Sequence, residues 1–425
     1  MFKKARLLWL PLLCAAFLST AHATYSIVAC DPKTRECGVA VQTNNLAVGA
    51  SVPYAQAGVG ALASQFETNP MYGPRGLALM AGGKGPEETL QQLLREDGNF
   101  EGEGIEARQV GMVAVDGRAA FYTGKEAADS NWAGARSGAG YSVQGNGLAG
   151  PQVVDAMERA FLDTPGSLSD RLLAALVAGD AVGGQKTGRE SAALLVRTPD
   201  GFPLDVDLRV DHSANPVAEL VKLYNLQSAR QQLIEAGIAA NRGQFNQAKA
   251  SLVAAVARAN DWPRVTIRAA KTAEQIEEPL LALQYITMAF SQNPAWAQEE
   301  IGAGDYAEVG ASPLFHRWVS REQEQRALEA YRKISDPKQV SPEERVDLSR
   351  KLLEVGHPQE ALVLLRQPDG AGQTIQFDLL RAQAYSAEGN DTAALEQCMH
   401  AQKQDPQNLR VRLRIAQLEQ KAAAR

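Results

Sequence analysis

A spaced pattern of small and bulky residues recurs in the second half of the chain and limits what that half can fold into. The copies are Gly243-x-Phe245-x-x-Ala248-x-x-x-Leu252-x-x-Ala255, Ala282-x-x-x-Ile286-x-x-Ala289 followed by Pro294, Gly356-x-Pro358-x-x-Ala361-x-x-x-Leu365, and Gly389-x-Asp391-x-x-Ala394-x-x-x-Cys398-x-x-Ala401 followed by Pro406. The anchoring alanines at positions 248 and 282 are 34 residues apart, and those at 361 and 394 are 33 apart. Small residues let paired helices approach, the bulky position fills the groove between them, and a proline ends the second helix. The pattern therefore predicts an all-α region of stacked helix pairs over residues 227–425.

This spacing resembles that of tetratricopeptide repeats. The 79 residues between Ala282 and Ala361 exceed one repeat, so a degenerate repeat or an insertion is expected around 295–340. An irregular helical bundle is the alternative, which the period and the matched positions disfavour. Repeats of this kind offer a groove that can hold a protein or peptide partner, or serve self-association.

The first half of the chain, residues 24–226, is rich in glycine and alternates β-like runs with helical ones. Strands are predicted at 24–30, 37–43, 58–64, 109–115, 118–123, 141–145, 191–197 and 205–210. Helices are predicted at 74–82, 86–96, 150–162 and 168–178. This order of elements predicts an α+β domain of two packed sheets with helices outside, because two pairs of helices separate three groups of strands.

Residues 1–23 have the features of an export signal. Its parts are a basic start at Lys3, Lys4 and Arg6, an apolar run over 7–18, and the A-x-A cleavage site Ala21-His22-Ala23. The apolar run is too short to span a bilayer, so no membrane anchor is expected to remain. Cleavage after Ala23 would place the mature protein in the periplasm or outside the cell, with Thr24 as its first residue.

The net charge of the chain limits the classes of partner that it is expected to bind. Removing residues 1–23, which carry three basic and no acidic side chains, changes the formal net charge from −6 to −9. We therefore expect neither nucleic acid nor an anionic membrane surface as a partner.

An N-terminal threonine carries a nucleophile and a base on one residue. Its hydroxyl can attack a carbonyl carbon while its own α-amine accepts the proton, directly or through one water. An α-amine has an unperturbed pKa of about 7.7–8.0, so much of it is a free base near neutral pH. Thr24 is therefore the candidate catalytic nucleophile, against the plain alternative that any residue can follow a signal peptide.

Cys30 and Cys37 lie on either side of a polar turn between two predicted strands. In an oxidising compartment two cysteines that face each other across a hairpin can form a disulfide. The strand register cannot be read from the sequence, so the bonded and the free state both remain open. Cys398 has no obvious partner, and the cysteines do not suggest a zinc site.

Several motifs of the first half are shared with a known family. They include Thr24-Tyr25-Ser26-Ile27-Val28-Ala29, Gly38-Val39-Ala40-Val41, Asn69-Pro70-Met71-Tyr72-Gly73-Pro74-Arg75-Gly76-Leu77, Tyr141-Ser142-Val143-Gln144-Gly145-Asn146 and Leu208-Arg209-Val210-Asp211-His212. Through them, residues 24–225 resemble the bacterial domain-of-unknown-function 1028 family, which is grouped with the N-terminal nucleophile hydrolases. The resemblance implies a four-layer αββα sandwich. It also implies a hydrolase that uses Thr24 to cleave amide bonds through an acyl-enzyme, although the family itself is named for lacking a known function.

The sequence departs from the proteasome-type relatives of that superfamily, which place a lysine close to the nucleophile. Between Thr24 and Leu94 the only lysines are Lys33, in a predicted turn, and Lys84, in a predicted loop. The α-amine must then act as the base, steered by neutral polar groups.

Neutral polar residues at the ends of two predicted strands supply those groups. We take Asn44 and Asn146 as catalytic, because an asparagine amide can donate to a developing oxyanion. Thr43, Asn45 and Gln144 beside them are candidate substrate contacts. The alternative is a structural role in turns and at strand ends.

Further candidate substrate contacts lie near the end of the domain. They are Arg189, Ser191, Asp207, Asp211 and His212. His212 is the only histidine between Thr24 and Leu226, so any Ser-His-Asp arrangement would depend on it, and no G-x-S-x-G motif is present. Structural ion pairs are the alternative for Arg189 and the aspartates, and we expect neither a metal nor a cofactor.

Two functions are compatible with this sequence. One is an exported amidohydrolase that acts on a small amide or peptide through Thr24. The other is a binding or scaffold protein in which the hydrolase-like domain is inert and the helical repeats hold the partner.

Overall fold

The chain divides into two compact units, with the division along the sequence between Tyr224 and Asn225. The computed structural model describes residues 23–259, 261–366 and 374–423. The first unit contains sheets and helices. The described residues of the second unit form helices and no β-strand. This confirms an α+β region followed by an all-α region, and the division lies close to the boundary predicted after residue 226.

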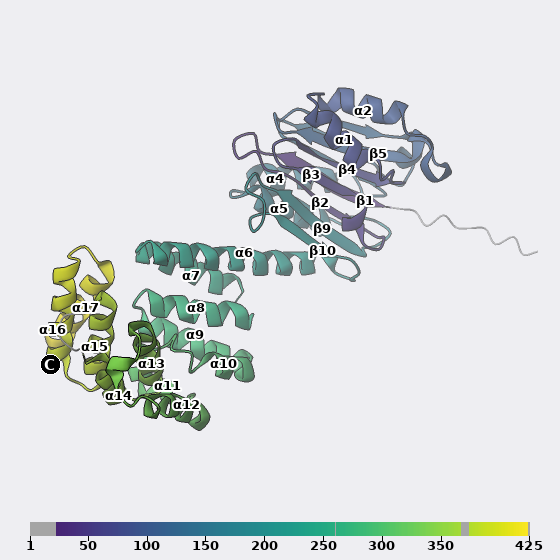
Figure 1. Ribbon diagram of the computed structural model, residues 1–425. Helices are drawn as coiled ribbons and strands as arrows, with labels where there is room; N and C mark the ends of the chain where they lie inside the picture. Colours follow the sequence, from purple (N-terminus) through teal and green to yellow (C-terminus); the bar gives the residue numbers. More distant parts are fainter. Residues whose placement is uncertain (1–22, 260, 367–373, 424–425) are drawn as a thin grey trace, which may run out of the picture. The chain divides into compact units, whose positions relative to one another are not determined.

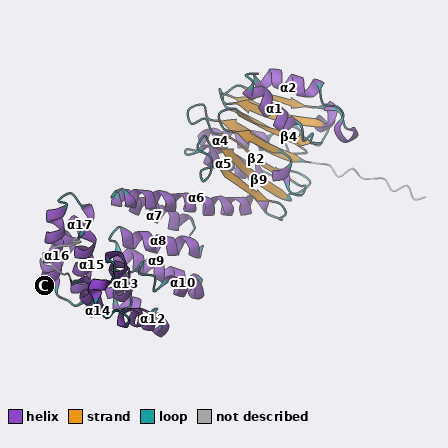
Figure 2. Ribbon diagram, in the orientation of Figure 1, coloured by secondary structure: helices purple, strands orange, loops and turns teal. Residues whose placement is uncertain are grey.

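The described strands of the first unit form two antiparallel sheets (Figures 1 and 2). The strands are β1 (Thr24–Cys30), β2 (Cys37–Thr43), β3 (Pro53–Gln56), β4 (Gly60–Phe66), β5 (Arg108–Ala114), β6 (Ala119–Thr123), β7 (Gly134–Gly138), β8 (Tyr141–Asn146), β9 (Ser191–Arg197) and β10 (Val206–Val210). One sheet has the order β10-β9-β2-β1-β8-β7 and the other the order β3-β4-β5-β6. β3 and β7 were not predicted, because β3 is short and half-exposed and β7 has no run of apolar residues.

Helices cover the outer face of each sheet. They are α1 (Tyr72–Ala81) and α2 (Pro86–Arg95) on the four-stranded sheet, and α4 (Gln152–Asp163) and α5 (Leu168–Ala181) on the six-stranded sheet, with the single turn α3 (Lys125–Ala128) between β6 and β7. α5 begins at a capping box, because the Ser167 hydroxyl accepts from the Asp170 amide and the Asp170 carboxylate accepts from the Ser167 amide. The inner faces of the two sheets pack on each other, so the layers run helices, sheet, sheet, helices (Figure 2).

The layer between the sheets has an apolar end and a polar end. Alternation along β1 sends Tyr25 and Ile27 toward α4 and α5. Val28 and Cys30 lie in the apolar cluster between the sheets, with side chains of β2, β4, β5 and β9. Thr24 and Ser26 share that inner face but lie at the start of the strand, outside the cluster. The buried polar end of the layer is therefore where β1 begins.

Cys30 and Cys37 are bonded to each other in the structure. They are register partners in the β1–β2 hairpin, and their Cα atoms are 4.1 Å apart. A crosslink that closes a loop this short stabilises a protein by about 2 kcal/mol, largely by restricting the unfolded chain. We therefore expect the Cys30→Ser/Cys37→Ser variant to lose about that much free energy of unfolding in urea. Reductant should lower the unfolding midpoint of the wild type and not that of the variant, and equal midpoints for both proteins under oxidising conditions would contradict the prediction.

The second unit is a succession of helices. α6 (Pro216–Asn241) enters it from the first unit, and the rest are α7 (Phe245–Arg258), α8 (Pro263–Gln275), α9 (Pro279–Gln292), α10 (Pro294–Glu300), α11 (Pro313–His316), α12 (Arg321–Arg332), α13 (Pro342–Glu354), α14 (Pro358–Leu365), α15 (Ile375–Ala387), α16 (Asp391–Gln404) and α17 (Leu409–Ala423). Among the described residues, no helix combines the length and the apolar character that a membrane span requires.

The predicted helix pairs are present. α8 packs on α9, α13 on α14, and α15 on α16. The anchoring alanines 248, 282, 361 and 394 are all fully buried. Gly243, Gly356 and Gly389 have φ angles of +71°, +87° and +77°, which turn the chain from one helix of a pair into the next. Three helices, α10, α11 and α12, occupy the region between α9 and α13, where the sequence predicted a degenerate repeat or an insertion.

Candidate active site around Thr24

Thr24 lies at the polar end of the layer between the sheets, with a strand on each side. It is the first residue of β1 and is 3% exposed. Its register partners are Thr43 on β2 and Asn146 on β8. Directly opposed residues of antiparallel strands point to the same face of a sheet. The sheet order therefore brings together three residues that are distant in sequence.

The hydroxyl of Thr24 is held by Thr43. The two Oγ1 atoms are 3.0 Å apart, and the Thr43 hydroxyl donates to the backbone carbonyl oxygen of Ala23 at 2.8 Å. Because a hydroxyl has one proton, Thr43 must accept from Thr24 and donate to Ala23. The hydroxyl proton of Thr24 therefore points at Thr43.

The backbone nitrogen of Thr24 donates to the side-chain oxygen of Asn146 at 3.1 Å. A chain of amides fixes this orientation, because the Asn146 nitrogen donates to Gln109 Oε1 at 2.8 Å and Gln109 Nε2 donates to the Gly145 carbonyl at 3.0 Å. A backbone carbonyl can only accept, so the nitrogen end of Gln109 must face it. Asn146 consequently presents its oxygen to Thr24.

Donors surround the carbonyl oxygen of Ala23. The Thr43 hydroxyl donates to it at 2.8 Å, and the backbone nitrogen of Asn44 lies 3.5 Å away. The Asn44 side chain turns its oxygen to the Ala23 nitrogen at 3.2 Å and its nitrogen to Thr187 Oγ1 at 2.8 Å. Asn44 and Asn146 were expected to donate from their side chains to an oxyanion. In the structure both side chains turn their oxygen toward the backbone beside Thr24, and the donors to the carbonyl are a hydroxyl and a backbone amide.

A buried network of neutral side chains continues from Thr24 into the layer between the sheets. Gln65 Nε2 donates to the Thr24 carbonyl at 3.3 Å and to Gln109 Oε1 at 2.8 Å, and Ser26 donates to Gln65 Oε1 at 2.6 Å. Gln144 Nε2 in turn donates to Ser26 at 2.6 Å. Gln144 is therefore tied to the network beneath Thr24 and is fully buried. A Cβ at position 111 would lie 2.0 Å from Gln144 Oε1, so the glycine there makes room for this side chain.

Ser26, Gln65 and Gln109 were missed as site residues by the sequence argument. Each is a polar residue in a largely apolar strand, and each is buried. Ser26 follows Thr24 with the period of two that places both on one face of β1. A polar residue within a largely apolar strand was the feature of the sequence that could have indicated these site residues.

The other residues that the sequence predicted as substrate contacts are bound to neighbouring residues of the protein. Arg189 pairs with Asp180 at 3.0 Å, Asp207 with Arg197 at 2.7 Å, Asp211 with Arg209 at 2.9 Å, and His212 with Glu190. Asp207 lies on β10, which β9 and β2 separate from β1. Ser191 accepts from the Val48 amide at 3.0 Å and donates to the Asn45 carbonyl, so it holds the segment after β2. No set of three or more His, Cys, Asp or Glu placed to hold a metal ion occurs in the part of the chain that the structure describes.

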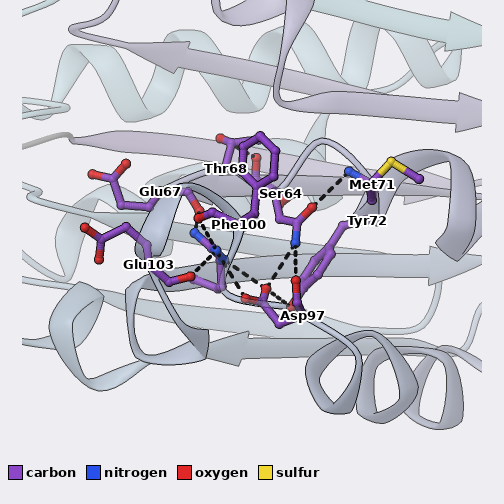
Figure 3. A network of polar contacts seen from close by, with 10 residues as sticks. Ser64, Glu67, Thr68, Met71, Tyr72, Asp97, Phe100 and Glu103 are labelled. Atoms are coloured by element: carbon purple, nitrogen blue, oxygen red, sulfur yellow. Dashed lines mark hydrogen bonds and ion pairs between the residues drawn. The ribbon is translucent and has the colours of Figure 1, made fainter.

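A second buried network, on the other face of the four-stranded sheet, fixes the ends of β4 and β5 (Figure 3). Arg108 is 1% exposed and binds both carboxylate oxygens of Asp97, at 3.0 and 3.2 Å. Its other donors reach the backbone carbonyls of Glu67, Phe100 and Glu103. Burial alone would raise the pKa of Asp97, but hydrogen bonds from Arg108, Tyr72 and Asn69 outweigh burial and lower it. Because Arg108 adjoins Gln109 in β5, the network supports the strand that carries Gln109 beneath Thr24.

The fold and the site define a class of protein: two packed sheets between helix layers, with a buried threonine at the start of a central strand. Residues 24–220 match the model of a family of unknown function (DUF1028). The crystal structure of protein SPO2555 from Silicibacter pomeroyi, described with the same family model, is 32% identical, and the match covers 48% of this chain and 88% of that one with a TM-score of 0.43. Through residues 24–220 the chain belongs to the DUF1028 family.

The second unit also has a similar solved structure. TTC0263, a thermophilic TPR protein in Thermus thermophilus, is 18% identical, and the match covers 45% of this chain and 98% of that one with a TM-score of 0.24. The helix pairs of the second unit are defined by the contacts between their helices. No curated protein matches the chain.

Proposed function

We propose that this protein is an exported amidohydrolase of the N-terminal nucleophile type, with Thr24 as both nucleophile and base. One observation carries the proposal: buried neutral side chains bind every reacting group, with the Thr43 hydroxyl on both the Thr24 hydroxyl and the adjoining Ala23 carbonyl, and Asn146 on the Thr24 nitrogen. Export rests on the features of residues 1–23. Residues 1–22 lie outside the described residues, so the sequence supplies that part of the argument.

The Ala23 carbonyl stands in for the carbonyl group of a substrate. It adjoins Thr24 and accepts a hydrogen bond from Thr43 Oγ1 at 2.8 Å, and the backbone nitrogen of Asn44 lies 3.5 Å away. Once cleavage removes Ala23, a substrate carbonyl can take the same place. The two donors would then stabilise the negative charge that develops on its oxygen.

The proposed reaction proceeds in two steps. Thr24 Oγ1 attacks the carbonyl carbon, and the α-amine, oriented by Asn146, accepts the hydroxyl proton and passes it to the leaving nitrogen as the C–N bond breaks. A water then attacks the threonyl ester, which releases the carboxylic acid and restores the hydroxyl. The α-amine takes the place of a lysine, and the side chains that contact Thr24 are neutral. A small amide or a peptide is the proposed substrate.

The requirement for a free amine is the test of this proposal. A chain released from a fusion directly before Thr24 has the amine, whereas a matched chain that keeps Ala23 has an amide in its place. We expect only the first to hydrolyse a panel of chromogenic amides and dipeptides, with a difference of roughly 100-fold or more, because the base is lost in the second. Equal rates for the two chains would exclude the α-amine as the base.

A further inference from the structure

A cavity of about 420 Å³ lies within the second unit, outside the hydrolase-like domain. It is formed by the end of α6, the start of α7, and residues of α13, α15 and α17. Its lining includes the apolar side chains of Phe245, Ile375, Leu379, Leu380 and Leu409. Its volume is in the range of small-ligand sites and can hold one large side chain with its backbone.

Two arginines, Arg350 and Arg410, line the same cavity, and none of its lining residues is acidic. Arg410 is bound to Glu277. Arg350 is half-buried and makes neither a hydrogen bond nor an ion pair with any described residue. The carboxylates that act on it, Asp305 and Asp347, are bound to lysines at 2.8 and 2.7 Å.

The buried part of the Arg350 side chain therefore has no described partner for its charge, and taking an unpaired charge out of water costs free energy. Burial and the neighbouring charge of Arg410 lower the pKa of Arg350, although its guanidinium keeps its proton, so the positive charge is held there at a cost in free energy. An anion bound beside Arg350 would remove this penalty. A carboxylate or a phosphate also matches the planar fork of the guanidinium.

Amide side chains complete the lining, at Asn241, Gln376 and Asn408. Amides both donate and accept, as a peptide backbone requires. A free phosphate would leave the apolar side chains uncovered, and a fatty acid would leave the amides without partners. A peptide that ends in an apolar residue matches the guanidinium, the apolar side chains and the amides, with its carboxylate at Arg350, its last side chain on the leucines and its backbone on the amides.

We infer that this cavity binds the C-terminus of a partner peptide or protein, with Arg350 recognising the terminal carboxylate and the apolar lining residues selecting a hydrophobic last residue. The site is independent of Thr24 and gives the helical unit a ligand whether or not the first unit is an enzyme.

Binding of a fluorescein-labelled peptide Gly-Ser-Gly-Ser-Ala-Leu to the full chain tests the inference by fluorescence anisotropy. We expect the peptide with a free carboxylate to bind, and its C-terminal amide and an otherwise identical peptide ending in aspartate to bind at least about tenfold more weakly. Arg350→Gln should weaken binding of the free peptide by a similar factor, and Arg350→Lys by less. Arg412→Gln, an arginine on α17 outside the cavity, is the matched control and should bind as the wild type does.

Three results would overturn the inference. They are no binding of the free-carboxylate peptide at millimolar concentration, equal affinity for the acid and the amide, and displacement of the peptide by inorganic phosphate or oleate at lower concentration than by unlabelled peptide. Circular dichroism of the Arg350→Gln variant separates a lost contact from a lost fold. If that variant is unfolded, the comparison of acid and amide on the wild type still decides.

Discussion

Replacing Thr24 with alanine should lower amide hydrolysis by roughly 10⁴-fold or more, because the variant keeps the α-amine but has no hydroxyl to form the acyl-enzyme. The buried contacts of the nitrogen with Asn146 and of the carbonyl with Gln65 do not involve the lost hydroxyl. We therefore expect the variant to fold. The measurement is kcat/KM on the best substrate of the amide panel, with protein that begins at residue 24.

Two matched variants separate loss of the nucleophile from general damage to the site. Thr24→Ser keeps the hydroxyl and should retain most of the activity. Thr43→Val keeps the shape of the side chain but removes the donor to the carbonyl oxygen, so we expect a loss of about 10²–10³-fold in kcat. Residual activity of Thr24→Ala close to that of the wild type would show that another group is the nucleophile.

Replacing Arg108 with methionine should destabilise the first unit by about 3–5 kcal/mol, because it leaves the Asp97 carboxylate buried without its cation. The side chains of Arg108 and Asp97 are 1% and 3% exposed, and three backbone carbonyls also lose their donor. Urea unfolding read by hydrogen-exchange mass spectrometry assigns the change to the first unit.

The Arg118–Asp116 pair offers a control in the β5–β6 hairpin. Its side chains are 63% and 48% exposed, so Arg118→Met should leave the free energy of unfolding almost unchanged. Adding Asp97→Asn to Arg108→Met should recover part of the loss, since no unpaired charge remains. Equal effects of Arg108→Met and Arg118→Met would contradict the assignment of the buried network as a main support of this sheet.

The lowered pKa of Asp97 adds a pH dependence to this prediction. A carboxyl whose pKa is lower in the folded state stabilises the fold above its unfolded pKa, and the stabilisation is lost as the pH falls through the folded value. For Asp97 the loss therefore sets in at about its ordinary value of 3.8 and continues below it. The Asp97→Asn variant should lack that part of the acid sensitivity.

The sequence predicted the strands of the site well, because the hydrophobic alternation of single strands determines them. β1, β2 and β9 have the predicted bounds. The choice of Thr43 and Asn146 as companions of Thr24 depended only on their places at strand ends. The structure brings all three together through the order β2-β1-β8.

Contacts between the two sheets could not be predicted in the same way. Gln65 and Gln109 reach Thr24 and Asn146 only because the four-stranded sheet packs face to face on the six-stranded one. Side-chain orientation was equally out of reach, since the direction in which Asn44 and Asn146 turn their amides is decided by partners such as Thr187 and Gln109. Arg189, Asp207, Asp211 and His212 were chosen by residue type, and their ion pairs depend on how the chain folds around them.

The N-terminus of the protein recovered from the exporting cell tests the central claim most directly. Intact mass and N-terminal sequencing should show a chain that begins at Thr24, with the free amine that the proposed mechanism requires. A chain that begins at His22 would carry two residues before the threonine and leave no free amine on it. That result would contradict the hydrolase proposal and favour a protein that acts through its helical repeats alone.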